Sequence, residues 1–109
     1  MENEYVFVYV TAESEEQALS IARVVVHERL AACGNVLPGM QSVYWWDGSV
    51  REAAEAVLIL KTRRDLFDAL AARVRALHSY ECPCIVALPI AAGSAPYLDW
   101  IALETVVRS

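Results

Sequence analysis

A histidine and two cysteines lie close together late in the chain, in the arrangement H-x₃-C-x-C, as His78, Cys82 and Cys84. Imidazole is the commonest transition-metal ligand, and it is largely neutral at pH 7. Thiolates prefer soft ions such as Cu(I), and two cysteines separated by one residue point the same way on an extended segment. We therefore predict a metal site made of His78, Cys82 and Cys84.

Each of these residues also has a structural interpretation. His78 follows a predicted helix, where its ring could donate to the last carbonyl groups. Cys84 directly precedes an apolar segment, and a free cysteine often packs as a small apolar residue. Both alternatives stay open on the sequence alone.

A second group of candidate residues centres on Glu55, which interrupts an apolar run at 53–60. A carboxylate in such a run needs a partner or water. Lys61 follows six residues later, and this even spacing puts both side chains on one face of a strand. We predict a polar pocket at a subunit boundary, lined by Trp46, Glu55, Lys61 and Tyr80 beside His78. The alternative is an ion pair between subunits that fixes the register of their assembly.

The element that must position Glu55 is an unusually long β-hairpin around Asp47-Gly48, a strong hairpin-turn signal. We expect arms over Val36–Trp46 and Val50–Lys61, each about 36 Å long at ~3.3 Å per residue. A domain of this size has a radius of gyration of about 13 Å, so the arms should reach another chain. We expect a bulge at Pro38-Gly39 because proline cannot donate to an interior ladder.

Within this hairpin, Trp45 and Trp46 must point to opposite faces. We expect one of them to cover the core and the other to reach an interface or the rim of the pocket. An aromatic anchor of this kind is typical of protein interfaces.

The remaining elements follow from apolar periodicity and capping signals. We expect a strand at Glu4–Val10 buried on both faces, a helix from the capping box at Ser14 to near Cys33-Gly34, a helix at Asp65–Leu77, a buried strand at Ile85–Ile90 and a helix at Ala95–Glu104. This order predicts an α+β, ferredoxin-like βαββαβ fold with an antiparallel sheet, both helices on one face and an added C-terminal helix. The length predicts a single domain over residues 1–109.

The composition narrows the class of protein. The net charge is −5 and the only basic run is residues 61–64, which argues against a nucleic-acid partner. No apolar stretch approaches the ~20 residues of a membrane helix, and no signal peptide is apparent. With three cysteines, a disulfide framework is not expected, so we predict a cytoplasmic protein. The 57% hydrophobic content favours burial between subunits.

The chain resembles the CutA family of divalent-cation tolerance proteins over most of its length, from Val6 to Leu103. The resemblance rests on the segments ERLAAC at 28–33, LPG at 37–39, SVYWWDG at 42–48, Glu55, ILKT at 59–62, HSYECP at 78–83, LPI at 88–90 and Tyr97-Leu98 with Trp100. It implies ferredoxin-like protomers in a tight homotrimer with interlocking hairpins. It also implies a role in tolerance of copper and other divalent cations, with no established reaction and no required cofactor.

The resemblance also implies a copper site that this chain alters. In some members copper is held by a cysteine at the end of the first strand and by histidine near the exit of the second helix. This chain has Val10 at the cysteine position and Leu77-His78 in place of two histidines. It also has Ser79 and Cys84 where the family usually has proline and glutamate.

Three other functions are weighed against cation tolerance, and one of them is purely structural, a stable trimer that scaffolds a partner protein through its C-terminal segment. The alternative is a trimeric small-molecule sensor with ligand clefts between subunits, which a metabolite but no metal would stabilise against heat. An acyl-phosphate hydrolase would need a glycine-rich phosphate loop with an arginine after the first strand, and residues 11–14 (TAES) offer neither. We therefore expect that the protein is not an enzyme.

Overall fold

The computed structural model describes residues 4–105 of the chain. Its elements are β1 (Tyr5–Ala12), α1 (Glu15–His27), β2 (Cys33–Trp46), β3 (Ser49–Arg63), a 3-10 turn (Arg64–Leu66), α2 (Phe67–Leu77), β4 (Ile85–Pro89) and α3 (Ala95–Glu104). The four strands form one sheet in the order β2-β3-β1-β4, and every neighbouring pair is antiparallel. The α+β class and the antiparallel sheet are thus confirmed.

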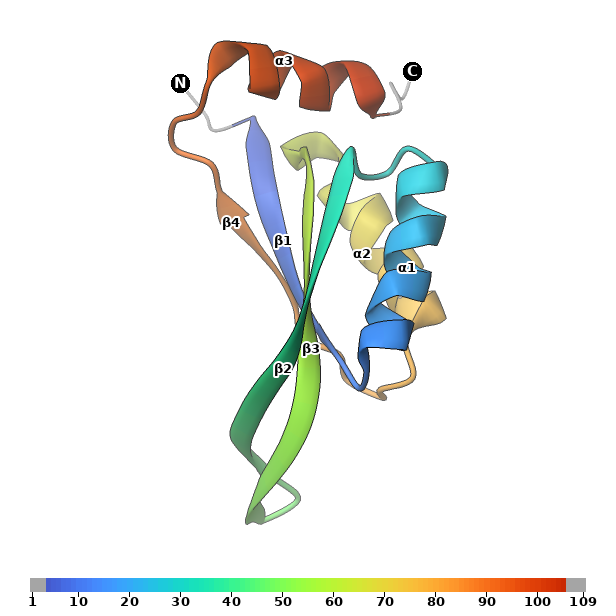
Figure 1. Cartoon of the computed structure of the whole chain (residues 1–109), viewed down its shortest axis with the longest axis vertical. Coiled ribbons are helices and arrows are strands. Elements are labelled where there is room, and N and C mark those ends of the chain that lie inside the picture. The colour runs from blue at the N-terminus through green and yellow to red at the C-terminus, as the bar shows by residue number, and fades with distance from the viewer. Residues whose placement is uncertain (1–3, 106–109) are drawn as a thin grey trace.

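The sheet has one covered face and one open face. Helices α1 and α2 pack side by side on the same face, while the distal half of the β2–β3 hairpin extends alone beyond them (Figure 1). Helix α3 lies across the opposite end of the sheet. The core between sheet and helices is formed by apolar side chains such as Val8, Val10, Ile21, Leu58, Leu60 and Leu70, all buried.

Strand β1 shows the consequence of this one-sided packing. Val6, Val8 and Val10 are buried against the helices, whereas Phe7, between them, is 40% exposed on the open face. Strand β4 is largely exposed as well, including Val86 and Leu88. The expectations that β1 is buried on both faces and that β4 is a buried strand are wrong for the single chain. Within residues 4–105, α1 and α2 both pack on one face and leave Phe7, Val86 and Leu88 exposed on the other.

The hairpin is confirmed and is longer than predicted, with 14 residues in β2 and 15 in β3. Its turn places Asp47 at φ 54° and Gly48 at φ 82°, the positive values that a tight hairpin turn requires. The predicted bulge is also present, since the register shifts between Leu37 and Met40 with Gly39 at φ 81°. The bulge adds twist to the base of the arm.

The two tryptophans of the hairpin do not divide between core and surface. Trp45 is 74% exposed and Trp46 is 47% exposed. The expectation that one of them covers the core is wrong, because both lie on the half of the hairpin that extends beyond α1 and α2. Only Trp46 borders the pocket described below.

Helix α1 begins as predicted but ends earlier. The Ser14 hydroxyl caps the helix by accepting from the Gln17 amide at 3.1 Å. At the other end, Arg29 adopts φ 62°, its amide donates to the Val26 carbonyl, and the Leu30 amide donates to the Val25 carbonyl. This is a Schellman motif with arginine where glycine is usual. The predicted end near Cys33-Gly34 is therefore wrong.

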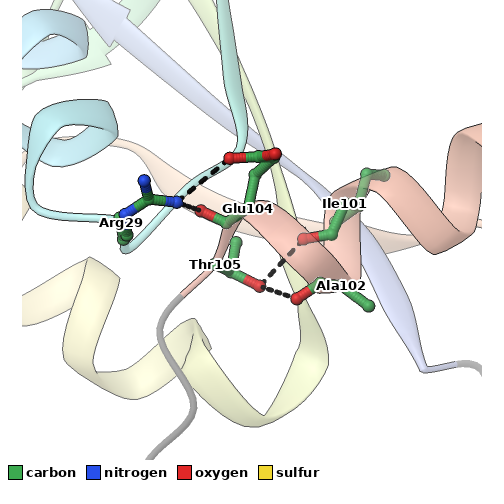
Figure 2. A network of polar contacts seen from close by, with 5 residues as sticks. All are labelled: Arg29, Ile101, Ala102, Glu104 and Thr105. Atoms are coloured by element: carbon green, nitrogen blue, oxygen red, sulfur yellow. Dashed lines mark hydrogen bonds and ion pairs between the residues drawn. The ribbon is translucent and has the colours of Figure 1, made fainter.

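Arg29 also connects the end of α1 to the end of α3. Its Nη1 donates to the carbonyl oxygen of Glu104 at 3.3 Å and to the carboxylate Oε1 of Glu104 at 3.0 Å (Figure 2). Beside it, the Thr105 hydroxyl donates to the carbonyl groups of Ile101 and Ala102. These contacts provide hydrogen-bond donors for the carbonyl groups of Ile101, Ala102 and Glu104 at the end of α3. The helix spans residues 95–104, as predicted.

Helix α2 begins two residues later than predicted because the 3-10 turn Arg64–Leu66 precedes it. Leu70 and Val74 of the helix, and Leu66 of the preceding turn, are buried. The helix ends at Leu77, so His78 opens the loop that leads to β4.

Candidate functional site

A pocket of about 740 Å³ lies between the hairpin and the loop that joins α2 to β4. It is lined by Thr11, Ser42, Val43, Tyr44, Trp46, Arg51, Glu55, Ser79, Tyr80, Glu81, Cys82 and Cys84. Alternation along β3 puts Glu55 on the open face of the sheet, together with Arg51. The sheet thus provides the floor of the pocket, and residues 79–84 provide a wall.

Glu55 and Tyr80 form the central polar contact of this pocket. The Tyr80 hydroxyl donates to Oε2 of Glu55 at 2.6 Å, a short bond typical of a charged acceptor. Burial raises the pKa of Tyr80, and the bond to the Glu55 carboxylate raises that pKa further. The phenol therefore stays protonated and keeps one oxygen of Glu55 in place.

His78 holds the wall of the pocket through both of its ring nitrogens. Nδ1 accepts from the Tyr80 amide at 3.0 Å, so the ring proton sits on Nε2, which donates to the Thr11 carbonyl at 2.7 Å. The ring centroid lies 4.8 Å from that of Tyr80. The helix-capping alternative is wrong for the side chain, because these bonds direct the ring to β1 and to the loop.

The two cysteines of the loop differ in their surroundings. Cys82 is exposed and Cys84 is half-buried, and both border the pocket. Burial raises the pKa of Cys84, and the charge of Glu55 raises that pKa further. Cys84 is therefore a thiol at neutral pH, and a metal would have to displace its proton.

The chain brings together only part of each predicted group. Lys61 lies away from the pocket, with its ammonium group 5.6 Å from the ring centroids of both Phe7 and Tyr97. It is six residues from Glu55 along β3, or about 20 Å. Among residues 4–105, no three His, Cys, Asp or Glu side chains come close enough together to hold a metal ion. His78 is thus not joined with the two cysteines as a three-ligand site.

Sequence reasoning missed several residues of this pocket, among them Ser42, Tyr44 and Arg51. Ser42 and Tyr44 line it with Trp46, and strict alternation back from Trp46 would have placed all three on one face. Arg51 pairs with Tyr44 in the register of the hairpin, which the Asp47-Gly48 turn already determines. The signal that could have found them is the alternation of side chains between the two faces of each strand of the hairpin.

Comparison with known proteins gives consistent matches. The sequence profile described as "CutA1 divalent ion tolerance protein" matches residues 6–104. The Divalent-cation tolerance protein CutA of Thermus thermophilus is 51% identical over 98 residues, which are 90% of this chain and 95% of that protein. The chloroplastic Protein CutA 1 of rice (Oryza sativa subsp. japonica) is 46% identical over 100 residues, or 92% of this chain. This chain spans only 56% of that rice protein.

Solved structures agree with the sequence matches. CutA1 from Oryza sativa superposes with a TM-score of 0.92 at 45% identity, covering 94% of each chain. The Thermus thermophilus protein superposes with a TM-score of 0.91 at 49% identity, covering 94% of this chain and 99% of that one. Within residues 4–105, no helix has the length and apolar character needed to cross a membrane. The chain belongs to the CutA1 family of divalent ion tolerance proteins.

Proposed function

We propose that the protein acts in divalent-cation tolerance as a homotrimer of ferredoxin-like protomers, without catalysis, and that it binds copper as Cu(I) through Cys82 and Cys84. The observation that carries the copper proposal is that both thiols border one pocket beside the carboxylate of Glu55. Soft thiolate ligands select Cu(I) over harder ions. Two thiolates suffice for a linear Cu(I) site, so a third ligand is not required.

His78 takes a positioning role in this proposal. Its ring holds Tyr80 and the strand end at Thr11, so it fixes the loop that carries both cysteines. A direct bond from His78 to copper would break one of these two contacts. The His78→Ala substitution should therefore weaken copper binding by loosening the loop rather than by removing a ligand.

The homotrimer is supported by surface that the chain leaves uncovered. Phe7, Val86 and Leu88 on or beside the open face are 40%, 48% and 51% exposed. The hairpin adds Val43, Trp45 and Val50, which are each more than half exposed. Apolar exposure on this scale is typical of subunit contacts.

A competition titration tests copper binding. Metal-free, reduced protein is titrated with Cu(I) in the presence of a colorimetric Cu(I) chelator, with Zn(II) titrated separately for comparison. We expect one Cu(I) per chain, lost in Cys82→Ser and in Cys84→Ser and retained in Cys33→Ser, the matched control outside the pocket. Binding should weaken as the pH falls, since protons compete for the thiolates. Equal Cu(I) binding by the native protein and by all three serine variants would refute the site at Cys82 and Cys84.

A second candidate function is a trimeric small-molecule sensor. The pocket volume of about 740 Å³ lies in the range of organic-ligand sites, and Glu55, Tyr80 and Trp46 offer polar and aromatic contacts. Thermal unfolding of metal-free protein with a panel of metabolites tests this alternative, because a bound ligand raises the melting temperature. Stabilisation by a metabolite in the Cys82→Ser/Cys84→Ser variant would favour the sensor.

We also propose a cytoplasmic location, without nucleic-acid or membrane partners. The three cysteines are free, which suits a reducing compartment, and the net charge of −5 disfavours nucleic acid. Fractionation of the native host, followed by detection of the protein, tests the location.

A further inference from the structure

We infer that the pocket binds an organic ammonium ion with an aromatic or apolar body, held by the Glu55 carboxylate and by the rings of Tyr44, Trp46 and Tyr80. The inference deepens the second candidate function, a site for a small ligand, and it does not depend on the two thiols. Four features of the pocket support it.

The first feature is a carboxylate without a cationic partner. Glu55 is half-buried, and its Oε2 accepts from the Tyr80 hydroxyl at 2.6 Å. Among residues 4–105, Glu55 has no other hydrogen bond and no ion pair. A partly buried charge is costly unless it is paired, so a cationic ligand would complete the site.

The second feature is that the two basic residues on the same face of β3 as Glu55 are engaged elsewhere. Arg51 borders the same pocket, but it is four residues away along β3, or about 13 Å, and its Nε donates to the Ser49 hydroxyl at 3.1 Å. Lys61 lies at the other end of the strand between two aromatic rings. Among residues 4–105, no Lys or Arg side chain therefore forms an ion pair with Glu55, although Arg51 lines another part of the pocket.

The third feature is the negative character of the inner wall. Glu81 borders the pocket, and Glu13 lies behind it, where it accepts from the Ser79 hydroxyl at 2.9 Å. After burial, the charge of Glu55 raises the pKa of both Tyr80 and Cys84, so its field reaches across the pocket. Such a field attracts cations and repels carboxylate ligands.

The fourth feature is the aromatic lining. Tyr44 and Trp46 border the pocket from the hairpin, with 41% and 47% of their surfaces exposed, and Tyr80 borders it from the loop. The faces of such rings attract cations, and this attraction is the usual basis for recognition of organic ammonium groups. The volume of about 740 Å³ is far larger than an ion needs and accommodates a ligand with an organic body.

Three probes of similar size but different charge test the inference. Phenethylamine is a cation at pH 7, 3-phenylpropanol is neutral and 3-phenylpropionate is an anion. Each is titrated at millimolar concentration into metal-free, reduced, full-length protein, with binding followed by calorimetry and by NMR of the probe. We expect the ammonium probe to bind at least tenfold more tightly than the other two.

Two matched substitutions locate the binding. Glu55→Gln keeps an acceptor for Tyr80 but removes the charge, so it should abolish the tenfold preference for the cation. Glu52→Gln removes the same charge from the opposite face of β3, outside the pocket lining, and should change nothing. The unfolding midpoints of both variants verify that each is folded.

The outcomes separate this inference from the copper proposal. Ammonium binding that survives in the Cys82→Ser/Cys84→Ser variant supports the inference whether or not copper binds to the native protein. Equal affinity for the three probes, or an unchanged preference in Glu55→Gln, overturns the inference and leaves the copper proposal intact. Failure of every probe to bind overturns the inference, and the small-ligand function is then decided separately by thermal unfolding with the metabolite panel.

Discussion

Thr62 shows how much a single buried polar side chain can contribute to this fold. Its hydroxyl is fully buried and donates to the Leu30 carbonyl at 2.7 Å, which ties β3 to the segment after α1. We expect Thr62→Val to lower the free energy of unfolding by about 1–3 kcal/mol, because the carbonyl group loses its buried donor. Urea unfolding measures this loss. Thr62→Ser keeps the hydroxyl and should cost less; an equal or greater loss in the serine variant would contradict the hydrogen-bond account.

Tyr80 gives a prediction about alkaline pH. Its pKa in the folded protein is raised above the value of about 10 that it has when unfolded. The unfolded chain therefore loses this proton first, so the stabilisation is complete below pH 10 and declines as the pH rises toward the folded pKa. We expect the stability difference between the native protein and Tyr80→Phe to shrink above pH 10. Phenolate absorbance from Tyr80 appearing at pH 10 in folded protein would contradict this.

At the scale of single residues, the sequence predicted most of the chosen pocket residues correctly. It did not predict which residues they contact. Trp46, Glu55, Tyr80, Cys82 and Cys84 do border one pocket. The even spacing of Glu55 and Lys61 puts both on one face of β3. The same six residues also separate them by about 20 Å, so the spacing alone was enough to exclude Lys61 from the pocket of one chain. The bonds of His78 to Thr11 and Tyr80 depend on tertiary contacts across 67 residues and on the loop conformation.

Gly34 is a position where β2 approaches α1 closely. A Cβ atom there would lie 3.1 Å from the Cβ of Ala22 in α1 and 3.2 Å from Cδ2 of Leu60 in β3. We expect Gly34→Ala to lower the free energy of unfolding by about 1–3 kcal/mol, since helix and sheet would have to separate. In an Ala22→Gly background the penalty should be smaller. Urea unfolding of the native protein, the two single variants and the double variant measures the difference. An identical penalty in both backgrounds would refute the packing explanation.

At the scale of elements, local signals placed the strands and helices well, and they failed where an end is set by unusual geometry. The Asp47-Gly48 turn and the Ser14 cap are local, so the sequence was sufficient to predict them. The end of α1 was misplaced because Arg29 adopts a conformation for which glycine is the usual signal. The nearest glycine, Gly34, serves close packing in β2 instead.

At the scale of the whole molecule, exposed aromatic residues on the hairpin predict the behaviour of the assembly. Trp45 is 74% exposed in the chain, so its removal costs the isolated fold little. We expect Trp45→Ala to shift the protein toward smaller assemblies in light scattering. Truncation of an aromatic hot-spot residue weakens an interface by about 2 kcal/mol or more. Trp45→Phe should retain most of the assembly. An unchanged mass for Trp45→Ala at micromolar concentration would contradict the interface role.

The apolar content of the sequence already indicated that the chain does not bury all its surface alone. The described residues extend 44 Å along their longest axis and about half of that across it, because the hairpin extends beyond the helices (Figure 1). The sequence could predict this extension from the length of the arms. It could not predict which face stays open, since that depends on both helices packing on the same side.

Native mass spectrometry of the reduced, Cu(I)-loaded protein tests the central claim most directly, because one spectrum reports both the number of chains and the number of copper ions. The account predicts a species of three chains carrying three copper ions, and a copper-free trimer for the Cys82→Ser/Cys84→Ser variant. A monomer, or a trimer with the same copper content in both proteins, would contradict it.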